Sequence, residues 1–165
     1  MIKEVRFYDA VEDSLVKFAV IIARANGKWV LCKHRERSTL EIPGGHREEG
    51  ETVDQTAVRE LKEETGAVEF SIRPVCVYSV VRDDAEESFG GLYAAEISFF
   101  EEELHSEIEK IVMLEELPEE NWTYPEIQPY LVEEARKRGV FDVRPGGPEA
   151  VRQGLPATAL DRRFA

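Results

Sequence analysis

The sequence is poor in cysteine, in long apolar runs and, over one stretch, in positive charge. Its two cysteines, Cys32 and Cys76, lie in apolar strand-like runs without CxxC spacing, so we expect reduced core thiols and neither a disulfide nor a metal role. No apolar run approaches the roughly 20 residues that cross a bilayer, which predicts a protein without a membrane span. Residues 1–6 lack the apolar core of a secretory signal, and together these absences predict a cytoplasmic protein.

Positive charge is nearly absent from residues 83–126, which hold fifteen acidic residues and one basic residue, Lys110. The whole chain has a net charge of −13, so the remainder is close to neutral. A surface this acidic repels a phosphate backbone, and a role as a general DNA or RNA binder is therefore disfavoured. A small phosphorylated substrate that arrives with a metal ion remains compatible with it. Most of these carboxylates are expected to form a solvated surface.

The predicted elements alternate between strands and helices. The Asn26-Gly27 pair between the apolar runs 16–23 and 28–33 is typical of a β-hairpin. Further strands are predicted at residues 40–42, 68–81 with a break near Pro74, 91–100 and 111–114. Residues 127–139 have helical spacing, and Gly139 follows as a stop. The mixture predicts an α/β layered sandwich.

The chain is long enough for one domain with a sizeable core, which we place at residues 1–141. From residue 142 the composition changes to a stretch that is rich in proline, glycine and arginine. We expect residues 142–165 to form a C-terminal tail that extends beyond the core.

A helix is predicted to begin at Val53 and to end before Gly66. Thr52 followed by Gln55 has the spacing of a capping box, and glycine suits the left-handed position after a last helical turn. Apolar residues at intervals of four predict a buried stripe, formed by Val53, Ala57 and Leu61.

Three carboxylates of this predicted helix, Glu60, Glu63 and Glu64, stand at positions i, i+3 and i+4 and therefore share one patch of its surface. Like charges so close repel one another, whereas a bound hard cation such as Mg²⁺ would make the cluster favourable. The alternative is a solvated helix face that Arg59 and Lys62 screen.

The residues around this patch follow a longer pattern. A Pro43-Gly44-Gly45 turn precedes the helix, and segment 45–67 has Gly45, Glu51 and the run Arg59-Glu60-Leu61-Lys62-Glu63-Glu64-Thr65-Gly66-Ala67. The segment resembles the Nudix box, whose pattern is glycine, five residues, glutamate, seven residues and Arg-Glu-aliphatic-x-Glu-Glu-x-Gly-aliphatic. Seven positions of the box require one residue type each, and all seven match. Ala67 is smaller than the usual aliphatic residue.

The resemblance to the Nudix family implies a Nudix-type α/β/α sandwich with a mixed β-sheet between helices. It implies an enzyme that uses Mg²⁺, with Mn²⁺ as a substitute, to hydrolyse a pyrophosphate bond in a nucleoside diphosphate linked to another group. The layout is most similar to the branch that cleaves nucleoside triphosphates or oxidised purine nucleotides such as 8-oxo-dGTP. Dinucleoside polyphosphates, nucleotide sugars and RNA 5′ ends are alternative substrates, and a non-catalytic nucleotide-sensing module is an alternative of another class. Many relatives are dimers, so a homodimer is compatible.

The resemblance also implies roles for particular residues. The metal ligands are the carbonyl oxygen of Gly44 and three carboxylates, namely Glu60, Glu63 and Glu64. Glu63 is in addition the candidate within the box for orienting or deprotonating the attacking water. Arg59 is expected to pair with Glu51 and so to fix the helix against the preceding loop.

Residues outside the box are weaker candidates. Many family members take a further carboxylate from a later loop, for which Glu107 is the first choice and Glu109 the second, with a solvated surface as the alternative. Arg35 and Arg37 could contact phosphates or could be exposed strand ends. His34 and His46 flank the site, where a structural or solvated role is expected. Four aromatic residues could stack on a base, although packing in the core or at a helix entry is favoured: Phe89, Tyr93, Trp122 and Tyr124.

Overall fold

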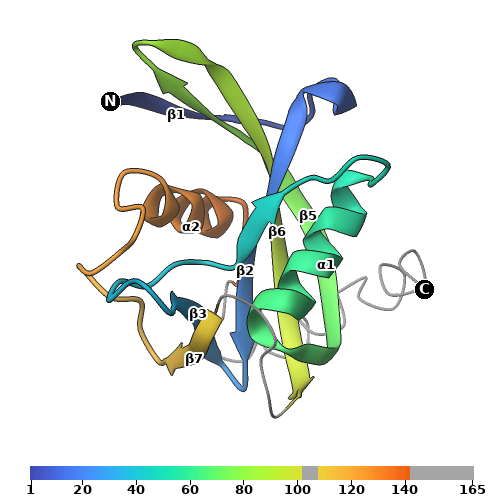
Figure 1. Cartoon of the computed structure of the whole chain (residues 1–165), viewed down its shortest axis with the longest axis vertical. Helices are drawn as coiled ribbons and strands as arrows, with labels where there is room; N and C mark the ends of the chain where they lie inside the picture. Colours follow the sequence, from blue (N-terminus) through green and yellow to red (C-terminus); the bar gives the residue numbers. More distant parts are fainter. Residues whose placement is uncertain (102–107, 142–165) are drawn as a thin grey trace.

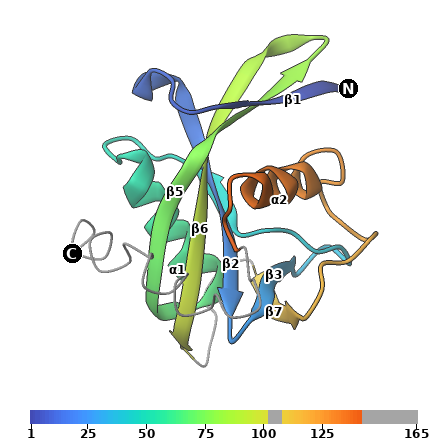
Figure 2. The same cartoon turned by 180° about the vertical axis from the view of Figure 1, so that it is seen from behind.

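A computed structural model describes residues 1–101 and 108–141. Within these residues a mixed β-sheet lies between two helices, α1 (Val53–Thr65) and α2 (Gln128–Lys137), which cover its opposite faces (Figures 1 and 2). This confirms the predicted α/β/α sandwich. The candidate residue Glu107 and the predicted tail 142–165 lie outside the described residues.

The sheet has seven strands in the order β1-β5-β6-β2-β3-β7, and β4 pairs with β2 beside this path. Only the β2–β6 pair is parallel among the described strands; the other pairs are antiparallel. A short 3₁₀ turn, η1 (Asp13–Leu15), leads into β2. The strands are β1 (Ile2–Tyr8), β2 (Val16–Ala25), β3 (Lys28–His34), β4 (Gly44–His46), β5 (Ala67–Arg82), β6 (Ala85–Phe100) and β7 (Ile108–Leu114).

A local turn signal in the sequence predicted the β2–β3 hairpin correctly. The β2–β3 turn places Asn26 at φ 52° and Gly27 at φ 76°, the left-handed pair that a tight hairpin requires. The expected break in β5 is a shift of register against β6 between Pro74 and Cys76, since proline cannot donate to the ladder.

Three expectations about strands need correction. Residues 40–42 do not form a strand, since Leu40 and Glu41 make only isolated bridges to Trp122 and Cys32. Strand β6 begins six residues before the expected position 91, at Ala85. Strands β1 and β4 were not predicted: β1 has no regular alternation of buried and exposed residues, and β4 is a three-residue strand that contains two glycines.

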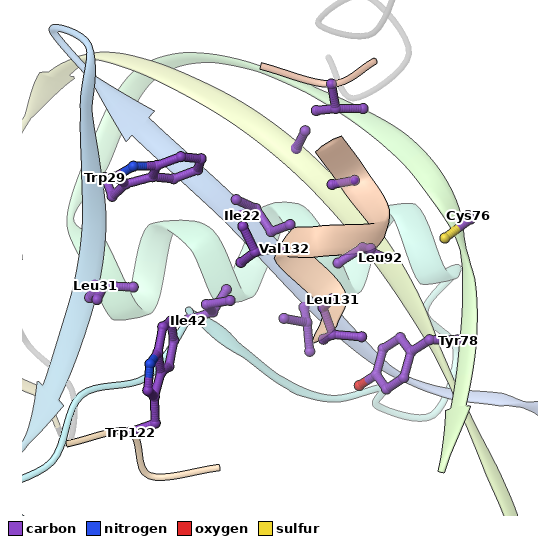
Figure 3. Close-up of a cluster of buried hydrophobic side chains, with 14 of the residues drawn as sticks. Ile22, Trp29, Leu31, Ile42, Cys76, Tyr78, Leu92, Trp122, Leu131 and Val132 are labelled. Atoms are coloured by element: carbon purple, nitrogen blue, oxygen red, sulfur yellow. The ribbon is translucent and has the colours of Figure 1, made fainter. Parts of the chain in front are cut away.

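Two hydrophobic clusters lie on the two faces of the sheet, because successive side chains of β2 point to opposite sides. Val20 and Ile22 pack with Leu131 of α2, in the cluster drawn in Figure 3. Ala19 and Ile21 pack instead with the α1 residues, among them Leu61. The two helices are thus fixed to one central strand from opposite sides.

Cys32 and Cys76 are free thiols and are buried, so their predicted place in the core is confirmed. Burial raises the pKa of the Cys76 thiol to about 11. Neither helix of the described residues has the length and apolar character that a membrane span requires.

Candidate functional site

Helix α1 begins and ends where the sequence predicts. The Thr52 hydroxyl accepts a hydrogen bond from the Gln55 backbone N–H at 3.1 Å, and the Gln55 side chain accepts one from the Thr52 N–H at 2.9 Å. At the other end Gly66 has a φ of 75°, in the left-handed region. The buried stripe is present at Ala57 and Leu61, which are fully buried. These limits fix which way the acidic patch of α1 faces.

The Gly44-Gly45 pair brings strand β4 unusually close to β2 and α1. A Cβ atom on Gly44 would lie 2.5 Å from the carbonyl oxygen of Ala19, and one on Gly45 would lie 2.5 Å from the carboxyl group of Glu60. No side chain fits at either position. The Gly44 N–H donates to Glu64 Oε1 at 2.9 Å, so backbone and carboxylates converge at this point.

Arg59 links the acidic residues to one another. Its Nε donates to Glu51 Oε2 at 2.6 Å and its Nη2 to Glu51 Oε1 at 3.1 Å, which is the predicted pairing in bidentate form. Its Nη1 lies 2.8 Å from Glu60 Oε1 and 3.3 Å from Glu63 Oε2. Nη2 also donates to the His46 carbonyl at 2.9 Å, which ties α1 to β4.

These contacts have electrostatic consequences. The hydrogen bonds from Arg59 lower the pKa of Glu51 to about 2, and the same pairing raises the pKa of Arg59. The pKa of Glu60 shifts in the opposite direction, because burial raises it more than Arg59 lowers it. The ionised form of Glu51 is therefore strongly favoured, whereas burial disfavours the ionised form of Glu60.

The acidic patch is less exposed than a helix surface. The side chains of Glu60 and Glu64 retain 12% and 13% of their accessible area, whereas Glu63 retains 51%. The alternative of a solvated helix face is therefore wrong for Glu60 and Glu64. A buried carboxylate needs a compensating positive charge or hydrogen-bond donors, and Arg59 and the Gly44 amide supply them to Glu60 and Glu64 respectively.

The patch borders a cleft of about 1000 Å³, whose wall also includes residues of the sheet and of α2. The cleft is bordered at its acidic end by Glu60, Glu63, Glu64, Gly44 and Gly45. The rest of its wall combines apolar residues, among them Val20, Ile42, Val80, Ile127 and Leu131, with polar ones such as Arg37, Arg82 and Gln128. The cleft thus joins a cluster of carboxylates to a wall of mixed apolar and polar residues.

A third set of cleft residues was not predicted from the sequence as a unit. Glu41 is buried, with Oε1 2.8 Å from His34 Nε2 and Oε2 2.9 Å from Arg37 Nη1. His34 Nε2 lies also 3.8 Å from Glu64 Oε2, which connects this set to the acidic patch. The i, i+4 spacing of Arg37 and Glu41 was the only local signal.

The weaker candidates are distributed as follows. Arg37 borders the cleft with its guanidinium paired to Glu41, whereas Arg35 is exposed and is not among the residues that border it. Glu109 forms an exposed ion pair with Lys33 at 3.0 Å, outside the cleft wall. Glu101, the last described residue before position 102, does border the cleft.

Of the aromatic candidates for stacking, Tyr124 borders the cleft and is 41% exposed. Trp122 and Tyr93 are buried, and Phe89 packs on Tyr8 with ring centroids 5.7 Å apart, so these three serve packing as the sequence favoured. The His46 ring packs on Phe18 at 4.5 Å beside the acidic end.

A mixed sheet between two helices, with an acidic helix pressed against a Gly-Gly strand at the end of a cleft, defines an α/β/α sandwich with a carboxylate-lined ligand site. The family model of the NUDIX domain matches residues 13–137. The chain belongs to the NUDIX family.

Two curated relatives come from Bacillus subtilis (strain 168). The putative 8-oxo-dGTP diphosphatase YtkD is 36% identical over 104 residues, which cover 62% of this chain and 65% of the relative. An ADP-ribose pyrophosphatase is 31% identical over 103 residues, which cover 60% of this chain and 56% of the relative. The chain thus spans less than two thirds of the length of either relative.

Solved structures share the fold. The Bacillus subtilis pyrophosphohydrolase BsRppH superposes with a TM-score of 0.69 at 27% identity, covering 82% of this chain and 91% of that one. A UDP-X diphosphatase superposes with a TM-score of 0.63 at 16% identity, covering 79% and 65% of the two chains, and supports the fold alone.

Proposed function

We propose that the protein is a Mg²⁺-dependent pyrophosphohydrolase of nucleoside triphosphates or oxidised purine nucleotides. The observation that carries the proposal is the convergence of Glu60 and Glu64 on the Gly44-Gly45 strand, with Glu63 on the same helix patch, in the wall of a cleft that also contains apolar residues. Once a bound cation neutralises these carboxylates, such a cleft suits a ligand with a phosphate end and a ring system. The similarity to the putative 8-oxo-dGTP diphosphatase supports this substrate class.

The residues at the acidic end fit a hard cation. Within residues 1–101 and 108–141 no three metal-binding side chains are grouped as a ready coordination shell, and Arg59 Nη1 takes the position between Glu60 and Glu63. The donors are nevertheless carboxylate and backbone oxygens, which Mg²⁺ prefers. Glu60, Glu63, Glu64 and the Gly44 carbonyl would hold it. The bound ion would neutralise the charge that develops on the phosphates.

The other residues of the site would position these ligands. The Gly44 amide fixes Glu64, and the bidentate pair with Glu51 fixes Arg59, so the patch is held before a substrate arrives. Glu63 is half-exposed and faces the cleft, where it can accept a hydrogen bond from the attacking water.

A further carboxylate from outside the helix is part of the proposal. Glu107 remains our candidate for accepting the proton of the water if the oxygens of Glu63 are all bound to metal. Glu101 is the alternative that the cleft wall favours. Glutamine variants of both, compared at saturating metal, separate them: the residue that acts as base loses kcat at least tenfold with little change in KM, whereas the other stays near wild type.

The test of the function is a substrate screen with the purified chain. The substrates are nucleoside triphosphates, 8-oxo-dGTP, ADP-ribose, dinucleoside polyphosphates, nucleotide sugars and 5′-triphosphate RNA, each with Mg²⁺, with Mn²⁺ and with a chelator. We expect metal-dependent release of pyrophosphate or phosphate from the triphosphates. Glu63→Gln and Glu64→Gln should lower kcat by about 10², because each removes a charge that acts on the transition state.

Glu133→Gln serves as the matched control, because Glu133 is exposed on α2. It should keep wild-type kcat. Turnover at the wild-type rate in both helix variants would refute the assignment of the acidic patch. Cleavage of ADP-ribose alone would move the protein to the substrate class of its other curated relative, and binding without cleavage would identify a nucleotide-sensing module.

A further inference from the structure

The side chain of Gln128 is a buried polar group in the wall of the cleft. It is the first residue of α2, it retains 5% of its accessible area, and it borders the cleft. Its Oε1 accepts a hydrogen bond from the backbone N–H of Ile42 at 2.8 Å. This contact joins α2 to the segment that continues into Gly44 and the acidic patch.

The contact with Ile42 fixes the orientation of the Gln128 amide. A backbone N–H needs an acceptor, and of the two ends of the amide only the oxygen is one. The NH₂ end must therefore point the other way. In the described part of the chain, no group accepts a hydrogen bond from Nε2, and Nε2 is not among the fully buried atoms that lack a partner. It therefore remains accessible from the cleft.

Buried apolar residues share the cleft wall with Gln128. Ile42 and Leu131 are buried at 3% and 0% exposure. Figure 3 shows the hydroxyl end of Tyr78 pointing toward Leu131. The Tyr78 ring packs closely on Gly90 of β6, where a Cβ would lie 2.6 Å from it. A donor in such a place strongly favours a ligand that presents an acceptor to it.

We infer that Gln128 is a specificity-determining residue whose NH₂ group donates a hydrogen bond to the exocyclic carbonyl oxygen of a purine base. The inference rests on the proposed function and names the base that the cleft selects. Guanine, hypoxanthine and 8-oxoguanine carry a carbonyl at the 6-position of the ring. Adenine carries an amino group there, which would face a second donor and leave both unsatisfied.

The competing interpretation is that Gln128 only anchors α2 to Ile42. Gln128→Glu separates the two, because it is nearly isosteric. One carboxylate oxygen keeps the Ile42 N–H bonded, while the other replaces a donor by an acceptor. A purely structural role would leave base preference unchanged. Gln128→Met removes both functions without introducing a charge, and it is the second variant.

The experiment measures kcat/KM for GTP, ITP and ATP with Mg²⁺ for the wild type and both variants, together with their melting temperatures. The ratio of GTP to ATP is the decisive quantity, because a general effect of the added charge on phosphate binding cancels in it. We expect the wild type to prefer GTP and ITP over ATP. The ratio should fall at least about tenfold in Gln128→Glu and move toward one in Gln128→Met.

ITP identifies the atom that is recognised. ITP has the carbonyl of guanine but lacks the 2-amino group, so its kcat/KM should resemble that of GTP in the wild type and in both variants. If its kcat/KM resembles that of ATP instead, Gln128 does not recognise the carbonyl and the inference fails. An unchanged GTP to ATP ratio in both variants overturns it as well and leaves Gln128 a structural anchor. Failure of the proposed function is a different result, since the wild type would then hydrolyse none of the nucleotides.

Discussion

At the scale of single residues, Gly45 and Glu60 are in such close contact that the glycine cannot be enlarged. Strand β4 is paired to β2, so a Cβ at position 45, 2.5 Å from the Glu60 carboxyl, must displace the side chain and not the strand. We expect Gly45→Ala to lower kcat about 10²-fold, the order of loss that a misplacement of about 1 Å produces. Steady-state kinetics on the substrate found in the screen measures it.

Gly50→Ala provides the control for Gly45→Ala. Gly50 has a φ of +85° with open space around it, so alanine there costs about 1 kcal/mol in backbone strain without touching a carboxylate. It should lower the melting temperature and keep kcat. If Gly45→Ala also keeps kcat, the position of Glu60 is irrelevant to turnover.

The Glu51–Arg59 pair should be visible in the pH dependence of stability. In the folded state the pKa of Glu51 is about 2, below its ordinary value of 4.5. Because the unfolded chain binds the proton more readily, the pair stabilises the fold fully above about pH 4.5, and this contribution is lost as the pH falls toward 2. Denaturant unfolding at a series of pH values should show a flatter acid limb for Glu51→Gln than for wild type. Parallel curves would mean that the pair contributes nothing.

At the scale of elements, the N-terminus of α1 depends on its capping box. Thr52→Ala removes the acceptor for the Gln55 N–H, and such a loss costs about 1 kcal/mol. For a chain of this size we expect a fall in melting temperature of roughly 2–4 °C. Turnover should be nearly unchanged, because Glu60 lies two turns further along the helix. Thr52→Ser keeps the hydroxyl and should match wild type; a similar loss in both variants would show that the methyl group matters and the cap does not.

Elements with local signals were predictable and those defined by distant partners were not. The ends of α1 and the β2–β3 turn are encoded within a few residues, so the sequence was sufficient. Strand β1 exists because it pairs with β5, about 70 to 80 residues away, and β4 because two glycines allow it to approach β2. No local pattern records such pairings.

The same distinction applies to the candidate site. The carboxylates of α1 and the Glu51–Arg59 pair follow from spacing, because all lie within one turn-and-helix segment. The contact of Gln128 with Ile42 joins residues 86 positions apart, and Glu41 became notable only when the fold buried it between His34 and Arg37. Both are polar residues whose importance arises from the loss of solvent, which a sequence pattern does not show.

At the scale of the whole molecule, the boundary of the domain can be tested by truncation. The ring of Phe141 lies 5.3 Å from that of Trp29 in an edge-to-face contact, and Val140 is 5% exposed. Residues 142–165 have few clustered apolar residues. We expect truncation after Phe141 to leave the melting temperature and kcat nearly unchanged.

Truncation after Gly139 is the comparison, because it removes Val140 and Phe141 from the cluster beneath α2. Loss of two buried or half-buried apolar side chains should cost several kcal/mol and lower the melting temperature clearly. A large loss already on truncation after Phe141 would place the domain boundary beyond residue 141.

The parallel pairing of β2 with β6 determines when the molecule can fold. Strand β2 is central, yet its long partner β6 ends at residue 100, so a nascent chain exposes one edge of β2 until most of the domain has been synthesised. Pairings between such distant segments form slowly because closing the intervening loop costs entropy. Pulse-labelled hydrogen exchange during refolding should therefore show the amides of β2 and β6 becoming protected together, after those of α1. An exposed central strand edge also favours aggregation, so expression at lower temperature should increase the soluble yield.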